Sequence, residues 1–229
     1  LPAPDAVPLR SAHLETAGYV VVPHRLPSGA LRALTANYGS PHHRSHIDRL
    51  SVHLHEDGRE LIGMMGQNSE FGRAGWGSTI ADSLLAVNGR DQIVGRGRLV
   101  RLETAGDWAA FEVATAPETP LYEPAVTYHR LLVSGPDFVV LLDRAASPEP
   151  AAFQWAFYPG MDLNVPPEWE AAEPPGLDPG EKQTGPLSPV RRGWRRAPGP
   201  AASLTLQAEV RDEARPMAVI VLAAPAQQP

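Results

Sequence analysis

Short strand-like segments, separated by turn residues, recur about every ten positions along this chain, and this spacing limits the fold more than any other feature. Apolar and polar residues alternate within the segments, as in strands with one buried face, whereas helical periodicity is scarce. The pattern predicts an all-β fold of stacked antiparallel sheets, of the β-sandwich or supersandwich type. The expected strands are residues 19–22, 31–38, 50–55, 60–65, 83–87, 99–104, 108–115, 126–134, 138–143, 152–158, 203–210 and 217–222.

Three turns carry the residues that tight hairpins require. They are Glu-Asp-Gly at 56–58, Val-Asn-Gly at 87–89 and Ser-Gly-Pro-Asp at 134–137. Glycine, asparagine and aspartate tolerate positive φ, so neighbouring strands are expected to run antiparallel.

Proline becomes frequent between residues 159 and 200, where strand alternation stops. Segments such as AAEPPGLDPGEKQTGPLSP cannot hold a helix or donate regularly to a sheet. We therefore expect a main β-sandwich domain at residues 1–165 and a long Pro/Gly-rich loop at 166–202. Closing strands at 203–229 are expected to pack on the sandwich.

Composition excludes several classes of protein and site. The 229 residues include no cysteine, which excludes disulfides, thiolate metal sites and a cysteine nucleophile. A net charge of −6, with no apolar run of about 18 residues, argues against nucleic acid or a membrane as partner. The first residues, LPAPDAVPLR, lack an initiator methionine and the apolar segment of a signal peptide, so we expect a trimmed chain.

Five of the eight histidines lie between positions 42 and 55. In the expected strand 50–55 the apolar residues point to the core, whereas His53 and His55 share the opposite face. With Glu60 they fit the first metal motif of cupins, but the later companion motif is missing. The favoured interpretation is a half-exposed polar strand face, and a cupin-like metalloenzyme using His53, His55 and Glu60 is an alternative.

A second pattern extends from the histidines over much of the chain. It comprises SHIDRLS at 45–51, GSTIADS at 77–83, VNGRDQ at 87–92, YHRLL at 128–132 and FVVLLD at 138–143. In this order the segments resemble the β-domain of heparinase II/III-like polysaccharide lyases. The resemblance covers about residues 17 to 163.

The resemblance implies β-elimination on an acidic, uronate-containing polysaccharide. In that family a tyrosine and a histidine transfer the protons, and an N-terminal helical toroid largely supplies them. We therefore expect a helical partner domain, in cis or in trans, and no activity from this chain alone. A noncatalytic carbohydrate-binding or assembly module is the alternative.

The resemblance also assigns site residues, with departures from the family pattern. Arg44 stands where the family has the first histidine of its pair, so His43 and Arg44 are the expected catalytic groups. Zinc is the implied cofactor, with His46 and Asp82 at two of its ligand positions. Met64 falls near the second position, an aspartate in the family, and Asp82 replaces the histidine of the third. Thioether is a poor zinc ligand, so the ligand set is incomplete.

Arginine and tryptophan mark the expected substrate contacts. Arg73 and Trp76 lie in a glycine-rich stretch, and Arg192 and Trp194 belong to RRGWRR at 191–196. An indole can stack on a sugar ring while guanidinium groups pair with carboxylate or sulfate. The alternatives are a solvated charged loop at 191–196 and a buried anchor at Trp76.

Two expectations concern the interior. Arg130 lies between apolar residues of an expected strand and is expected to form a partly buried salt bridge with Asp143 or a neighbour. The aromatic residues expected in the core are Trp108, Phe111, Phe138, Phe153 and Trp155.

Overall fold

The computed structural model describes most of the N-terminal two thirds of the chain and part of the remainder. The described residues are 9–39, 47–64, 79, 82–88, 90–123, 125–151, 153–155, 163–164, 170–171, 195–196, 203–210 and 213–220. They form β-strands and no α-helix, which confirms the all-β prediction. Within these ranges no helix has the length and apolarity needed to cross a bilayer.

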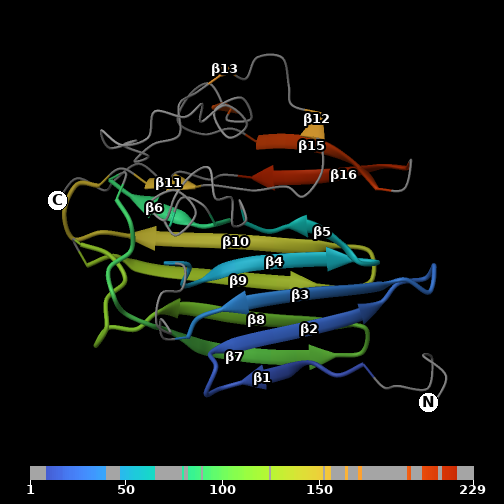
Figure 1. The fold of residues 1–229 in the computed structure, drawn as a ribbon, viewed down its shortest axis with the longest axis horizontal. Coiled ribbons are helices and arrows are strands. Elements are labelled where there is room, and N and C mark those ends of the chain that lie inside the picture. The colour runs from blue at the N-terminus through green and yellow to red at the C-terminus, as the bar shows by residue number, and fades with distance from the viewer. Residues whose placement is uncertain are drawn as a thin grey trace, which may run out of the picture. The chain divides into compact units, whose positions relative to one another are not determined.

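The first sheet is an antiparallel meander of five strands in chain order (Figure 1). Each strand pairs with the next one along the chain, and the predicted turn at 56–58 joins β4 to β5. The strands are β1 (Ala12–Leu14), β2 (Tyr19–Arg25), β3 (Leu31–Asn37), β4 (Ser51–Glu56) and β5 (Arg59–Ile62).

The second sheet has four antiparallel strands in the order β10-β9-β8-β7. These are β7 (Gly97–Ala105), β8 (Trp108–Thr115), β9 (Thr127–Ser134) and β10 (Val139–Ala146). A separate pair joins β6 (Leu85–Val87) to β11 (Phe153–Trp155). The hairpin predicted from Val-Asn-Gly at 87–89 was therefore wrong, because β6 pairs with this distant strand and not with the next one, β7.

Alternate residues of the central strands form the core. Val20 and Val22 of β2 and Leu34 of β3 are fully buried, and so are Phe111 of β8 and Leu132 of β9. This period of two is the one expected of strands with a single buried face.

Polar contacts join the two sheets. The Arg32 guanidinium on β3 donates to the backbone oxygens of Gly135 (3.0 Å) and Pro136 (3.1 Å), in the turn between β9 and β10. The Gly97 N–H, at the start of β7, donates to the Tyr38 oxygen at 2.8 Å. The sheets are thereby held together at more than one point.

The chain divides into two compact units. The first contains both large sheets, and the second comprises Met161–Pro174 and Pro179–Pro229. In the second unit β12 (Leu163–Asn164), β15 (Ser203–Val210) and β16 (Glu213–Ile220) form one sheet. Within the expected long loop, β13 (Glu170–Ala171) pairs with β14 (Arg195–Arg196). The packing of the closing strands on the sandwich stays a prediction.

The aromatic core was only partly predicted. Phe111 is fully buried, as expected, but Trp108, Phe138 and Phe153 are 47%, 46% and 43% exposed. The prediction was wrong for these three residues. Trp108 and Phe138 stand next to hairpin turns, where a side chain has few neighbours. The side chain of Trp155 lies outside the described part of the structure.

The turn between β4 and β5 depends on two residues with positive φ. Asp57 has φ 51° and Gly58 has φ 76°, which confirms the hairpin predicted from Glu-Asp-Gly. Open space surrounds the position of a Cβ at Gly58. A side chain at position 58 would therefore cause backbone strain and no steric clash.

We expect Gly58→Ala to lower the free energy of unfolding by about 1 kcal/mol, because alanine disfavours the left-handed region. Urea unfolding followed by circular dichroism measures the change. Gly58→Asn is the control and should lose less, since asparagine tolerates positive φ. Equal losses in the two variants would contradict the backbone explanation.

Candidate functional site

Most residues of the expected site lie outside the described part of the structure. They are His43, Arg44, His46, Arg73, Trp76, Arg192 and Trp194. Their catalytic, metal-binding and substrate-binding roles stay predictions. Asp82 is described, and so is the chain that directly follows His46.

Hydrogen bonds of the Thr79 side chain connect the chain next to His46 with the chain near Asp82. The Thr79 hydroxyl, three residues before Asp82, donates to the Ile47 oxygen at 3.0 Å. Thr79 Oγ1 in turn accepts a bond from the Gln92 N–H at 2.7 Å. Ile47, Thr79 and Gln92, distant in sequence, are thus neighbours in the fold.

A third segment reaches the same place. Met64 forms an isolated antiparallel bridge with Asp82. The Ser83 hydroxyl donates to the Gly63 oxygen at 2.8 Å, which fixes this contact. Two positions that the resemblance relates to metal ligands, Met64 and Asp82, therefore lie side by side.

Asp82 is a buried carboxyl group without hydrogen bonds. It is 1% exposed, and within the described residues neither of its carboxylate oxygens has a hydrogen-bond partner. Burial, and next the negative charge of Asp48, raise the pKa of Asp82 to about 8, while Arg49 opposes the rise. At neutral pH the group is therefore mostly protonated unless a cation binds it.

Asp48 is held in a different way. The Asn37 side chain donates to Asp48 Oδ2 at 3.1 Å, and the Arg49 guanidinium forms an ion pair with Oδ1. Asp48 is thus satisfied by its neighbours, whereas Asp82 is not. A cation entering this cluster would meet Asp82 as the carboxylate with free oxygens.

Tyr19 lies at the start of β2, beside the acidic pair, and is 38% exposed. Burial and then the Asp48 charge raise its pKa, Arg49 lowers it and Asp82 raises it further. The phenol therefore stays protonated at neutral pH and can donate a hydrogen bond. Tyr19 was not predicted from the sequence, because no local motif marks it.

Gln92 fixes the backbone that carries the acidic cluster. Its side-chain oxygen accepts the Arg49 N–H at 3.0 Å, and its amide donates to the Arg49 oxygen at 2.8 Å and the Tyr122 hydroxyl at 3.0 Å. The Tyr122 hydroxyl donates to the Leu85 oxygen at 2.8 Å. Gln92 was also missed, although it ends the motif at 87–92.

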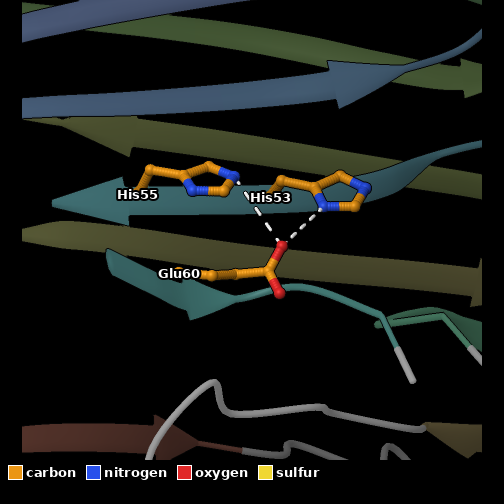
Figure 2. Close-up of side chains that lie close together, drawn as sticks. All are labelled: His53, His55 and Glu60. Atoms are coloured by element: carbon orange, nitrogen blue, oxygen red, sulfur yellow. Dashed lines mark hydrogen bonds and ion pairs between the residues drawn. The ribbon is translucent and has the colours of Figure 1, made fainter. Parts of the chain in front are cut away.

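His53, His55 and Glu60 form a second polar cluster on the β4–β5 hairpin (Figure 2). His53 Nδ1 lies 3.5 Å and His55 Nε2 lies 3.7 Å from the same Glu60 oxygen, Oε1. The side chains of His53 and His55 are 18% and 46% exposed, which confirms the half-exposed strand face. One ligand atom from each residue lies within 4.8 Å of the others, so the cluster could hold a metal ion.

Comparison with known proteins establishes the fold. No protein-family model matches the sequence, and no curated protein matches it significantly. Heparan sulfate lyase HepC from Pedobacter heparinus is 18% identical, with a TM-score of 0.51 over 62% of this chain. A heparinase III, the BT4657 gene product, is 13% identical, with a TM-score of 0.57 over 73% of this chain. The chain shares the fold of these heparinases.

A further heparinase III structure is 14% identical, with a TM-score of 0.51 over 62% of this chain and 23% of its own length. The match likewise covers 23% of HepC and 28% of the BT4657 product, so this chain corresponds to about a quarter of each enzyme. The resemblance seen in the sequence motifs is thus confirmed at the level of the heparinase-like fold.

Proposed function

We propose that this chain is the β-region of a lyase-like protein that acts on acidic, uronate-containing polysaccharide by β-elimination. The shared fold over 62–73% of the chain with structures named heparan sulfate lyase and heparinase III carries this proposal. Since the match covers only about a quarter of those enzymes, the remaining catalytic groups are assigned to a helical partner domain.

The chemistry needs a base for the proton next to the uronate carboxylate, an acid for the leaving oxygen, and a positive charge near the carboxylate. In this proposal His43 transfers a proton and Arg44 pairs with the carboxylate. Arg73, Trp76, Arg192 and Trp194 contact the sugar chain. Tyr19, whose raised pKa keeps its hydroxyl protonated, is a further donor near the acidic cluster.

Zinc at His46 and Asp82 belongs to the same proposal. The buried carboxylate of Asp82, with both oxygens unbonded within the described chain, supports a role toward a cation. Met64 in the neighbouring position weighs against a complete ligand set. When bound, zinc would offset the negative charge of Asp82 and Asp48.

Ultraviolet absorbance of unsaturated uronate products tests the proposal. We expect no product from the isolated chain on heparan sulfate, hyaluronan or alginate, and product when an N-terminal helical domain is fused to it or added. Arg44→Ala should then lower the rate by on the order of 100-fold or more, as loss of a transition-state charge partner does. Arg98→Ala, an exposed arginine of β7, is the matched control and should keep the rate.

Polysaccharide binding without product, even with the helical domain present, would favour a noncatalytic carbohydrate-binding or assembly module. One observation supports this second candidate. One position related to a metal ligand holds Met64, next to Asp82, and thioether is a poor zinc ligand. Absence of both binding and product would contradict both candidates.

A further inference from the structure

His53, His55 and Glu60 have the spacing of ligands to a shared metal ion. Zinc binds imidazole nitrogen and carboxylate oxygen at about 2.1 Å, so two ligand atoms of a tetrahedral site lie about 3.4 Å apart. The observed separations from Glu60 Oε1 are 3.5 Å to His53 Nδ1 and 3.7 Å to His55 Nε2. Figure 2 shows both imidazoles directed at this one oxygen.

A second histidine–glutamate pair in the chain gives the distance of a direct hydrogen bond, for comparison with the hairpin cluster. His129 Nδ1 on β9 lies 2.6 Å from Glu112 Oε1 on β8. The separations in the hairpin cluster are about 1 Å longer, beyond the range of strong hydrogen bonds. The two imidazoles therefore flank the carboxylate at a distance that leaves room for an ion.

The strand pairing places the three side chains on one face. His53 and His55 are two residues apart on β4, and His55 is directly opposite Glu60 on β5. The register shifts between Leu54 and His55, and such a bulge redirects the neighbouring side chains. The imidazole rings are within 10° of parallel, with centroids 6.5 Å apart.

The Glu60 carboxylate packs directly against Gly63. A Cβ at this position would lie 2.2 Å and 2.4 Å from the two Glu60 oxygens, so any larger residue would displace the carboxylate. The Ser83 hydroxyl holds the Gly63 oxygen at 2.8 Å. Gly63 thus leaves the space that the Glu60 carboxylate occupies, and this observation does not depend on the spacing of the two histidines.

We propose that His53, His55 and Glu60 form a binding site for a first-row transition-metal ion, with Zn²⁺ as the ion to test. Two imidazoles and one carboxylate are a donor set that suits Zn²⁺ and leaves a fourth position open. His55 is 46% exposed and Glu60 is 37% exposed, so that position faces solvent. The site is separate in its residues from the one expected at His46 and Asp82.

Isothermal titration calorimetry with Zn²⁺ tests the site on the full chain after chelator treatment. All proteins carry His46→Ala, so that the other expected zinc position does not contribute. We expect the His53→Ala/His55→Ala double variant and the isosteric Glu60→Gln variant each to lose at least the ~10–100-fold in affinity that even outer-shell losses cost. Bound Co²⁺ should show visible d–d absorption that both variants lose.

Gly63→Ala tests whether the position of the Glu60 carboxylate matters for metal binding, without changing a ligand. The carboxylate it meets is the end of a flexible side chain, so the fold should persist while the Zn²⁺ affinity falls about 10-fold. His129→Ala is the matched control, because it removes a histidine paired to a glutamate elsewhere, and it should bind Zn²⁺ as its parent does. Equal affinity in the parent, the double variant and Glu60→Gln would overturn the proposal.

Discussion

Arg130→Met is expected to lower the free energy of unfolding by about 3–5 kcal/mol, because a fully buried guanidinium is lost together with its ion pair to the part-buried Asp143 and its bonds to two buried backbone oxygens. Arg130 is 0% exposed, and its guanidinium donates to both Asp143 oxygens at 2.8 Å. The same group donates to the backbone oxygens of Leu50 (2.7 Å) and Ser83 (2.8 Å). Methionine fills similar space but leaves all four acceptors without this donor.

The positions of these acceptors explain why Arg130→Met should lose so much free energy of unfolding. Leu50 has φ 71°, a strained conformation for a leucine, and it leads directly into β4. Ser83 follows Asp82, so Arg130 ties β9 of the second sheet to both segments of the acidic cluster. Since whole domains are stable by about 5–15 kcal/mol, the variant is expected to unfold at low denaturant.

Urea unfolding followed by circular dichroism measures the effect. Arg101→Met is the matched control, because Arg101 is 45% exposed and pairs with Glu112 at 3.2 Å, and such pairs contribute less than about 1 kcal/mol. The double variant Arg130→Met/Asp143→Leu should recover part of the loss, because Asp143 is then no longer left unpaired. A single variant as stable as the Arg101 control would refute the account.

Local patterns predicted most of the strands. The expected segment 203–210 coincides with β15, and 108–115 coincides with β8. Alternation and turn residues act within a few positions of one another, so a sequence alone carries this information. The short edge strand β1 was missed, because Ala12–Leu14 is too short to show alternation.

Strand β16 shows where prediction from local sequence patterns fails. The sequence placed a strand at 217–222, but β16 begins at Glu213 and passes through Pro216. Proline cannot donate to a sheet, so it discouraged an earlier start. Position 216 pairs with Gln207 in the register, a contact that local sequence does not reveal.

The salt bridge between Arg130 and Asp143 was expected from the sequence and is confirmed. Its further bonds to Leu50 and Ser83 were not expected, because they join positions 80 and 47 residues apart. Similarly, the motifs indicated Asp82 but not the Asp48–Arg49 ion pair near it. Polar groups gathered by tertiary packing leave no periodic signal in the sequence, whereas strand faces do.

Asp82→Asn is expected to stabilise the metal-free chain at neutral pH. Burial raises the pKa of Asp82 from its ordinary value of 3.8 to about 8 in the folded state. Between these values the folded chain binds more protons than the unfolded chain, so the free energy of unfolding falls as the pH rises. Each pH unit in this window costs on the order of 1.4 kcal/mol, which makes the total at pH 7 a few kcal/mol.

Unfolding in urea at a series of pH values between 4 and 8, with chelator present, measures this dependence. Asparagine cannot ionise, so the free energy of unfolding of the variant should fall much less as the pH rises. The variant should therefore be the more stable protein at pH 7. Asp137→Asn, an exposed aspartate in the β9–β10 turn, is the control and should decline as the parent does. A parent whose stability is flat across this window would contradict the raised pKa.

The same titration with zinc in place of chelator separates the two roles considered for Asp82. A cation bound to the carboxylate favours its charged form, so zinc should remove the decline of stability with pH in the parent, and it should stabilise the parent more than the Asp82→Asn variant. If zinc stabilises both proteins equally, the ion binds elsewhere, and the His53–His55–Glu60 cluster is then the site that the structure supports. Asp82 would in that case be a buried acid that remains protonated at neutral pH, consistent with the noncatalytic module.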